Sequence, residues 1–229
     1  MLKIIGKSAA VAFLALSFAS QGSVIVDTAL WSLERSPARN SGPSGLTSAG
    51  GNQAVQNNNS NASIISDFSF TGDFNFTGSM TPTIVGFNDD DILGLVFGWQ
   101  DYQNHYRLGW EQGGYNDISS ASGMFLVREV AGVSTILFQQ EIFWQDNVDY
   151  NFVVGRSGNN ISFLLNGISQ SFTDTSFMSG KVGFYTESQT ARFGGLASAP
   201  QAPSNSVPAP APLALLGLGV LGLAYRRKK

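Results

Sequence analysis

The sequence predicts an all-β fold, a two-sheet sandwich or jelly roll, on the basis of three observations. Apolar residues alternate with polar or small ones through most of residues 31–196, and helical periods are almost absent. Short turn signals separate these runs at intervals of roughly 8 to 12 residues. A segment of this length can bury a sizeable core, and the 17 Phe residues supply much of it.

The expected strands follow one another along the chain. Four Phe residues between positions 68 and 76 alternate with polar or small residues, which predicts a half-buried strand. Residues 93–99 are apolar on one face and small on the other, which predicts a central strand. Trp99 and Trp110 share the alternation of their large apolar neighbours, so both indoles are expected in the core. Further strands are expected at residues 106–110, 124–130, 135–143, 150–154, 161–165, 169–172 and 181–185.

Turn signals connect these strands. Gly113-Gly114, Ala131-Gly132 and residues 157–160 are short loops of hairpin type, and Asn166-Gly167 is the sharpest hairpin signal in the chain. Residues 40–61 are rich in Ser, Gly and Asn, which predicts a mobile loop between an opening strand near Trp31 and the rest of the domain.

Composition excludes several kinds of site. The absence of Cys excludes disulfides, thiolate metal sites and a thiol nucleophile, and the single His, His105, excludes sites with several imidazoles. Six of the 13 basic residues lie at the chain ends, and the part between them has a formal charge of −9 from seven basic and 16 acidic residues. Such an acidic domain repels phosphate backbones, so no nucleic-acid partner is expected.

The N-terminal segment has the pattern of a secretory signal. Lys3 and Lys7 precede a short apolar run, and small residues follow at the spacing that signal peptidase prefers. We therefore assign residues 1–23 to a signal peptide and residues 24–199 to the sandwich. The apolar run is short for a membrane anchor, which is the alternative interpretation.

The C-terminal segment combines three parts. Residues 200–212 form a Pro-rich hinge, and residues 213–229 combine a Gly/Leu-rich helix with a basic tail that the positive-inside rule keeps in the cytoplasm. The hinge contains the motif Val207, Pro208, Ala209 and Pro210. This order resembles the PEP-CTERM sorting signal of Gram-negative, exopolysaccharide-producing bacteria, with Ala209 in place of the usual Glu.

That resemblance implies export, transient membrane insertion through the C-terminal helix, and processing by signal peptidase and an exosortase. The expected location is the cell envelope, cell surface or extracellular matrix, including biofilm. An ordinary C-terminal anchor that is never cut is the alternative.

A second resemblance lies inside the domain. Residues 88–100 contain three Asp followed by a Gly- and aromatic-rich strand, and residues 105–112 and 179–185 add two further matching strands. Together they resemble the thrombospondin C-terminal, laminin-G-like lectin family, which implies a concanavalin A-like jelly roll. In that family the acidic stretch lies beside bound calcium.

The acidic stretch is the candidate metal site. Carboxylate oxygens of Asp89, Asp90 and Asp91 are of the type that Ca²⁺ prefers, and Asp101 after the strand is a further candidate ligand. Adjacent carboxylates also repel one another unless a cation or solvent compensates them. A solvated acidic turn is the alternative.

Aromatic residues beside loops are the candidate ligand contacts. Tyr102, His105 and Tyr115 fall in or beside expected loops, where aromatic rings can stack on sugars. No paired-carboxylate strand, Gly-x-Ser-x-Gly elbow or phosphate-binding loop is present in the sequence, so no catalysis is expected. Three functions follow in order of preference: a lectin-like module for extracellular polysaccharide, a structural or adhesion protein that binds other proteins, and a jelly-roll hydrolase.

Overall fold

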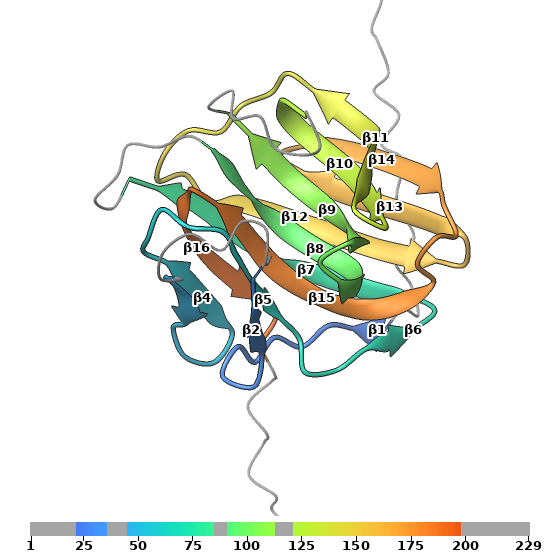
Figure 1. Ribbon diagram of the computed structural model, residues 1–229, viewed down its shortest axis with the longest axis horizontal. Helices are drawn as coiled ribbons and strands as arrows, with labels where there is room; N and C mark the ends of the chain where they lie inside the picture. Colours follow the sequence, from blue (N-terminus) through green and yellow to red (C-terminus); the bar gives the residue numbers. More distant parts are fainter. Residues whose placement is uncertain (1–21, 36–44, 85–90, 113–120, 198–229) are drawn as a thin grey trace, which may run out of the picture. The chain divides into compact units, whose positions relative to one another are not determined.

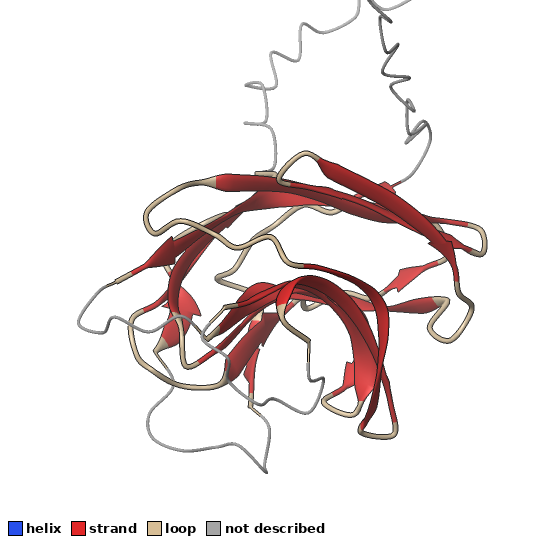
Figure 2. Ribbon diagram, turned by 90° about the horizontal axis from the view of Figure 1, so that it is seen from above, coloured by secondary structure: helices blue, strands red, loops and turns tan. Residues whose placement is uncertain are grey.

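Strands account for all the regular structure that is described. The structure is a computed structural model, and it describes residues 22–35, 45–84, 91–112 and 121–197. Within these residues the chain forms 16 β-strands and no helix, arranged as two eight-stranded sheets (Figure 1). Seen along the layers, the two sheets lie face to face and both are curved (Figure 2). The expected all-β sandwich is confirmed.

The first sheet contains β16, the last strand that the structure describes. Its strand order is β14-β13-β12-β7-β16-β4-β3, with β1 paired in parallel to β7 and all other neighbours antiparallel. In that order its strands are β14 (Ile168–Thr173), β13 (Asn160–Leu165), β12 (Tyr150–Ser157), β7 (Phe74–Thr83), β16 (Thr190–Gly195), β4 (Gln53–Gln56), β3 (Leu46–Ser48) and β1 (Gly22–Ser23).

The second sheet is antiparallel throughout. Its strand order is β11-β10-β9-β8-β15-β5-β2, with β6 paired to β15. In that order its strands are β11 (Val133–Gln140), β10 (Gly123–Val130), β9 (Asn104–Glu111), β8 (Ile92–Asp101), β15 (Ser179–Glu187), β5 (Ala62–Ile65), β2 (Ser32–Glu34) and β6 (Phe70–Thr71). It is bent so that its outer face is concave (Figure 2).

The predicted hairpins lie where the sequence places them. Asn166 and Gly167 have φ angles of 48° and 77° and connect β13 to β14, while Ala131 and Gly132 have φ angles of 51° and 76° and connect β10 to β11. Positive φ at both central residues is the geometry that matches the twist of paired strands. Gly113-Gly114 lies outside the described residues.

The core between the sheets is dominated by aromatic rings, as expected. Phe76 packs edge-on against Phe152 at 5.0 Å and lies 5.6 Å from Phe184, which also stacks on Trp31 at 5.6 Å. Trp110 is fully buried in the same core. Aromatic burial of this kind stabilises a sandwich by both buried area and ring geometry.

The structure differs from the predicted elements in four ways. The part of the 40–61 segment that is described, residues 45–61, is not a simple loop, because it contains β3 and β4. Its Gln56 side chain is fully buried and donates a 3.0 Å hydrogen bond to Thr186, which offsets the cost of burying an amide.

The other three differences concern where strands begin and end. β11 ends at Gln140, and Phe143 beyond it is 45% exposed, so the strand predicted at 135–143 is shorter. The Phe run is divided between β6 and β7, because Gly72 between them has a φ of 87°. The first strand, β1, overlaps the last two residues of the segment assigned to the signal peptide.

Candidate functional site

Trp99 is buried in an apolar cluster, as predicted, but a bulge in β8 turns it away from the space between the two sheets. Gly98 has a φ of 57°, and the pairing of β8 with β15 shifts register between Val182 and Lys181. An extra residue in a strand reverses the face to which every later side chain points. Phe97 therefore belongs to the core between the sheets, whereas Trp99 packs in a second apolar cluster with Val96.

This second cluster lies on the concave outer face of the second sheet. At its centre the Arg107 guanidinium lies 5.7 Å from the Phe125 ring and 5.1 Å from the Tyr185 ring. These rings come from β10 and β15, on either side of the β8–β9 pair, and the curvature of the sheet brings them to one cation. Arg107 and Tyr185 are only 3% and 6% exposed, so the floor of the concave face is closely packed.

Two of the three predicted ligand contacts meet at Trp99. The Trp99 ring lies 4.8 Å from the Tyr102 ring and 4.8 Å from the His105 ring. Tyr102 is half-buried, whereas His105 is only 3% exposed. Tyr115 lies outside the described residues. The first two residues thus form one aromatic group at the end of the concave face, with Tyr102 as its accessible member.

Burial also determines the protonation of this group. Burial, together with the nearby Arg107 charge, lowers the pKa of His105 to about 3. Burial raises the pKa of the Tyr102 hydroxyl above its ordinary value. The imidazole is therefore neutral at physiological pH, and its Nδ1 lies 3.1 Å from the Asp101 carbonyl oxygen.

The predicted calcium ligands that are described lie far apart. Asp91 precedes β8 and Asp101 is its last residue, so the full length of a ten-residue strand separates them, roughly 30 Å. The two side chains cannot bind the same ion. The Asp101 carboxylate instead accepts hydrogen bonds from the Gln103 backbone N–H at 2.7 Å and from the Asn104 side chain at 2.9 Å. These two bonds close the β8–β9 turn.

Asp89 and Asp90 lie outside the described residues. In the part of the chain that is described, no three acidic or imidazole side chains converge in a way that could hold a metal ion. Calcium at Asp89–Asp91 remains a prediction.

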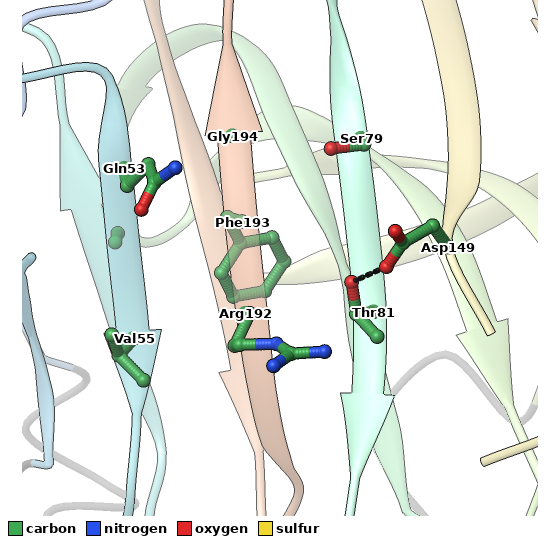
Figure 3. Close-up of a pocket in the computed structure, with 9 residues that line it drawn as sticks. Gln53, Val55, Ser79, Thr81, Asp149, Arg192, Phe193 and Gly194 are labelled. Carbon is green, nitrogen blue, oxygen red and sulfur yellow. Dashed lines mark hydrogen bonds between the residues drawn. The ribbon is translucent and has the colours of Figure 1, made fainter. Parts of the chain in front are cut away.

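A hollow of about 370 Å³ lies on the outer face of the first sheet (Figure 3). Gly194 on β16 pairs with Gln53 on β4 and with Ser79 on β7, and it contributes no side chain between them. One pair further along, Arg192 faces Val55 and Thr81. The hollow therefore forms where a glycine interrupts a row of outward-facing side chains.

The lining of this hollow is polar. The Thr81 hydroxyl donates a 2.5 Å hydrogen bond to the Asp149 carboxylate, and Arg192 extends along the surface on the same side (Figure 3). Gln53, Asp149 and Arg192 are exposed. The site thus presents a cation, an amide and hydroxyl groups on three adjacent strands, together with a carboxylate from the residue before β12.

Reasoning from the sequence missed this hollow. Its residues come from four distant segments, and none belongs to a recognisable motif. The available signal was the Arg192-Phe193-Gly194 sequence, in which a charged residue and a glycine share the outer face of a strand.

Comparisons with known proteins identify the C-terminal segment. Residues 206–228 match the family model of the PEP-CTERM protein-sorting motif, which includes Val207, Pro208, Ala209 and Pro210. The chain is therefore an exported surface protein that is sorted by an exosortase. No curated protein matches the sequence significantly. None of the described residues forms a helix long and apolar enough to cross a membrane.

Comparisons with solved structures identify the fold. The carbohydrate-binding module CBM66 from Bacillus subtilis is 17% identical, with a TM-score of 0.52 over 77% of this chain and 98% of that chain. A Bacillus subtilis protein of unknown function with a galectin-like fold is 12% identical, with a TM-score of 0.47 over 72% and 86% of the two chains. The Emp46p carbohydrate recognition domain in its metal-free form is 9% identical, with a TM-score of 0.48 over 72% and 85%. The chain thus shares its jelly-roll β-sandwich fold with that module from Bacillus subtilis.

Proposed function

We propose that the sandwich is a non-catalytic carbohydrate-binding module, and that the hollow at Gly194 holds one sugar residue of an extracellular polysaccharide. The hollow itself carries this proposal. Its volume of about 370 Å³ lies at the small end of the range for ligand pockets. Most of its lining residues lie on strands, which position polar groups more rigidly than loops do, and the Gln53, Asp149 and Arg192 side chains are exposed.

The polar lining matches the chemistry of a sugar. Each sugar hydroxyl both donates and accepts hydrogen bonds, so a binding site needs both kinds of partner. Arg192 donates, Asp149 accepts, and the Gln53 amide does both. Two further features support the proposal: the fold is shared with a carbohydrate-binding module, and the export signal delivers the domain to the cell surface.

The test is retention on surface polysaccharide purified from the producing organism. Gly194→Val fills the hollow with a side chain. The fold can accommodate it, because the nearest atom to an added Cβ is the Ser79 Oγ at 3.4 Å, an ordinary contact. This variant and Arg192→Ala should each lose at least about 10-fold in affinity. The matched control is Tyr102→Ala on the other sheet, which should bind like the wild type.

The outcomes separate the possible sites. Loss of binding in Tyr102→Ala alone would place the sugar at Tyr102 and His105, two of the ligand contacts that the sequence predicts, and would exclude the hollow. Binding that disappears with chelator would support a calcium-dependent module. No retention of the wild type would overturn carbohydrate binding of this polysaccharide.

A structural or adhesion role in the extracellular matrix is the second candidate function. The observation that favours it is an exposed strand at one edge of the second sheet, β11, which has no charged residue. Exposed edges of this kind pair readily with other chains.

A further inference from the structure

The two long edge strands of the sandwich carry no charge. β11 is the outermost strand of the second sheet and has eight residues, while β14 is the outermost strand of the first sheet and has six. Neither strand contains Asp, Glu, Lys, Arg or Pro. Those residues are what soluble proteins place on edge strands to prevent pairing with other chains.

Both edges lie at the same end of the sandwich (Figure 1). The Phe138 ring of β11 lies 6.4 Å from the Phe172 ring of β14, which places the two edges side by side. Val133 and Ile136 on β11 are 69% and 39% exposed. Within the described residues, β11 pairs only with β10 and β14 only with β13, so the outer backbone groups of both strands have no strand partner.

The same end of the molecule is held by a buried polar cluster. Asp174, directly after β14, accepts a 2.5 Å hydrogen bond from the Tyr106 hydroxyl and pairs with Arg128 of β10 at 2.8 Å. Burial opposes ionisation of Asp174, but the hydrogen bonds from Tyr106 and Ser176, together with Arg128, outweigh it and lower the pKa of Asp174. This ionised cluster connects the two sheets and fixes the edges in position.

The opposite end of the sandwich is protected. Its edge strands, β2 and β3, have three residues each, and β2 contains Glu34. Short strands and charges both discourage pairing between chains. Each copy therefore offers favourable edges at one end only, so association through that end stops at two copies and does not continue as a filament.

A second copy of the chain is the partner that fits this edge. The domain is acidic, and two copies that met elsewhere would bring like charges together, but the β11 edge has no charge to repel its equivalent. A bulge at Leu137 interrupts the β11 ladder, which leaves residues 133–136 as the regular segment. An antiparallel pair of such segments is self-complementary about a two-fold axis.

We propose that two copies of the protein associate through antiparallel pairing of their β11 strands, so that the second sheet continues from one copy into the other. Val133 and Ile136 lie on opposite faces of β11, so each adds an exposed apolar side chain to one face of the joined sheet. The β14 edge lies alongside and extends the contact to the first sheet. This association is independent of carbohydrate binding, because the hollow lies on the opposite half of the first sheet, among β4, β16 and β7.

The test is the molar mass of the exported protein by light scattering, from about 1 to about 100 µM. The wild type should have the mass of two chains at the upper end of this range. Thr135→Lys and Ile136→Lys place a charge on the exposed edge and should raise the dissociation constant at least about 10-fold. Both positions are exposed, and melting temperatures close to that of the wild type would show that the variants fold.

The matched control is Leu33→Lys on β2, which changes a 46% exposed apolar residue on the opposite edge of the same sheet. It should leave the dimer intact, as should Gly194→Val in the hollow. A wild type that stays monomeric throughout the range would overturn the proposal. So would a dimer that persists in both β11 variants, or one that dissociates equally in Leu33→Lys.

Discussion

The outer faces of the two sheets each carry an arginine in the middle of a strand, yet the two arginines are in opposite states. Arg107 on β9 is 3% exposed and lies between the rings of Phe125 and Tyr185. Arg192 on β16 is exposed and borders a hollow. The second sheet is bent with its outer face concave, so side chains from neighbouring strands converge on one another there (Figure 2). An outward-facing charge is therefore not necessarily a surface charge.

The largest expected effect is on stability, and it separates the two arginines. Arg107→Ala removes two cation–π contacts and the buried packing of the side chain, so we expect a loss of about 3 kcal/mol in the free energy of unfolding. Arg192→Ala should cost less than about 0.5 kcal/mol, because the side chain is exposed. Urea unfolding of both variants measures the difference. Equal losses would show that the burial of Arg107 contributes nothing.

The next effect is the pH dependence that the concave face confers. His105 has a folded-state pKa of about 3 against an ordinary value near 6.5, so between these values the unfolded chain binds one more proton than the folded one. The stabilising contribution is complete above pH 6.5 and is lost as the pH falls towards 3. Its slope is about 1.4 kcal/mol per pH unit.

The His105→Gln variant isolates this contribution. It should lack that part of the slope between pH 6 and pH 4, and denaturant unfolding at several pH values measures it. A variant with the same pH dependence as the wild type would mean that the imidazole is accessible to protons in the folded state.

Two glycines extend the comparison at smaller cost. Gly98→Ala places a Cβ at a φ of 57°, and that Cβ would lie 3.0 Å from atoms of Phe177 and Tyr106. We expect it to cost about 2 kcal/mol. Gly194→Ala meets nothing closer than 3.4 Å and should change stability by less than about 0.5 kcal/mol. Thermal unfolding of the pair tests whether the bulge is as constrained as its geometry indicates.

The smallest expected effect concerns the predicted calcium. If Asp89, Asp90 and Asp91 bind Ca²⁺ at the end of the concave sheet, calcium at about ten times its dissociation constant stabilises the fold by roughly 1.4 kcal/mol. Adding chelator should then lower the melting temperature of the wild type but not that of Asp91→Asn. An unchanged melting temperature in the wild type would exclude this site.

The sequence predicts where the strands lie better than it predicts which face of the sheet each side chain points to. β12, β13 and β14 lie close to their predicted ranges, and in β13 buried and more exposed residues alternate along the whole strand. In β8, by contrast, the first eight residues are all buried, so a period of two cannot distinguish the core face from the concave face. The bulge at Gly98 then reverses Trp99, and a glycine alone does not reveal it.

The candidate sites differ in the same way. Tyr102 and His105 are close in sequence and on one hairpin, so their proximity in space follows from local pairing. Gln53, Asp149 and Arg192 line one hollow only because β4, β16, β7 and the start of β12 follow one another across the sheet, and the order of strands in a sheet is a long-range property. The burial of Gln56 could not be predicted either, since its hydrogen-bond partner Thr186 is distant in the sequence.

The position of β16 has a mechanical consequence. This strand is the last in the domain before the sorting signal, and it lies inside the first sheet with β7 on one side and β4 on the other. A pull on an anchored C-terminus would load β16 along its own length, so that the hydrogen bonds to both neighbours are sheared together. Arg192 and Gly194 belong to the same strand, so tension between a polysaccharide bound there and an anchored C-terminus would pass directly through β16.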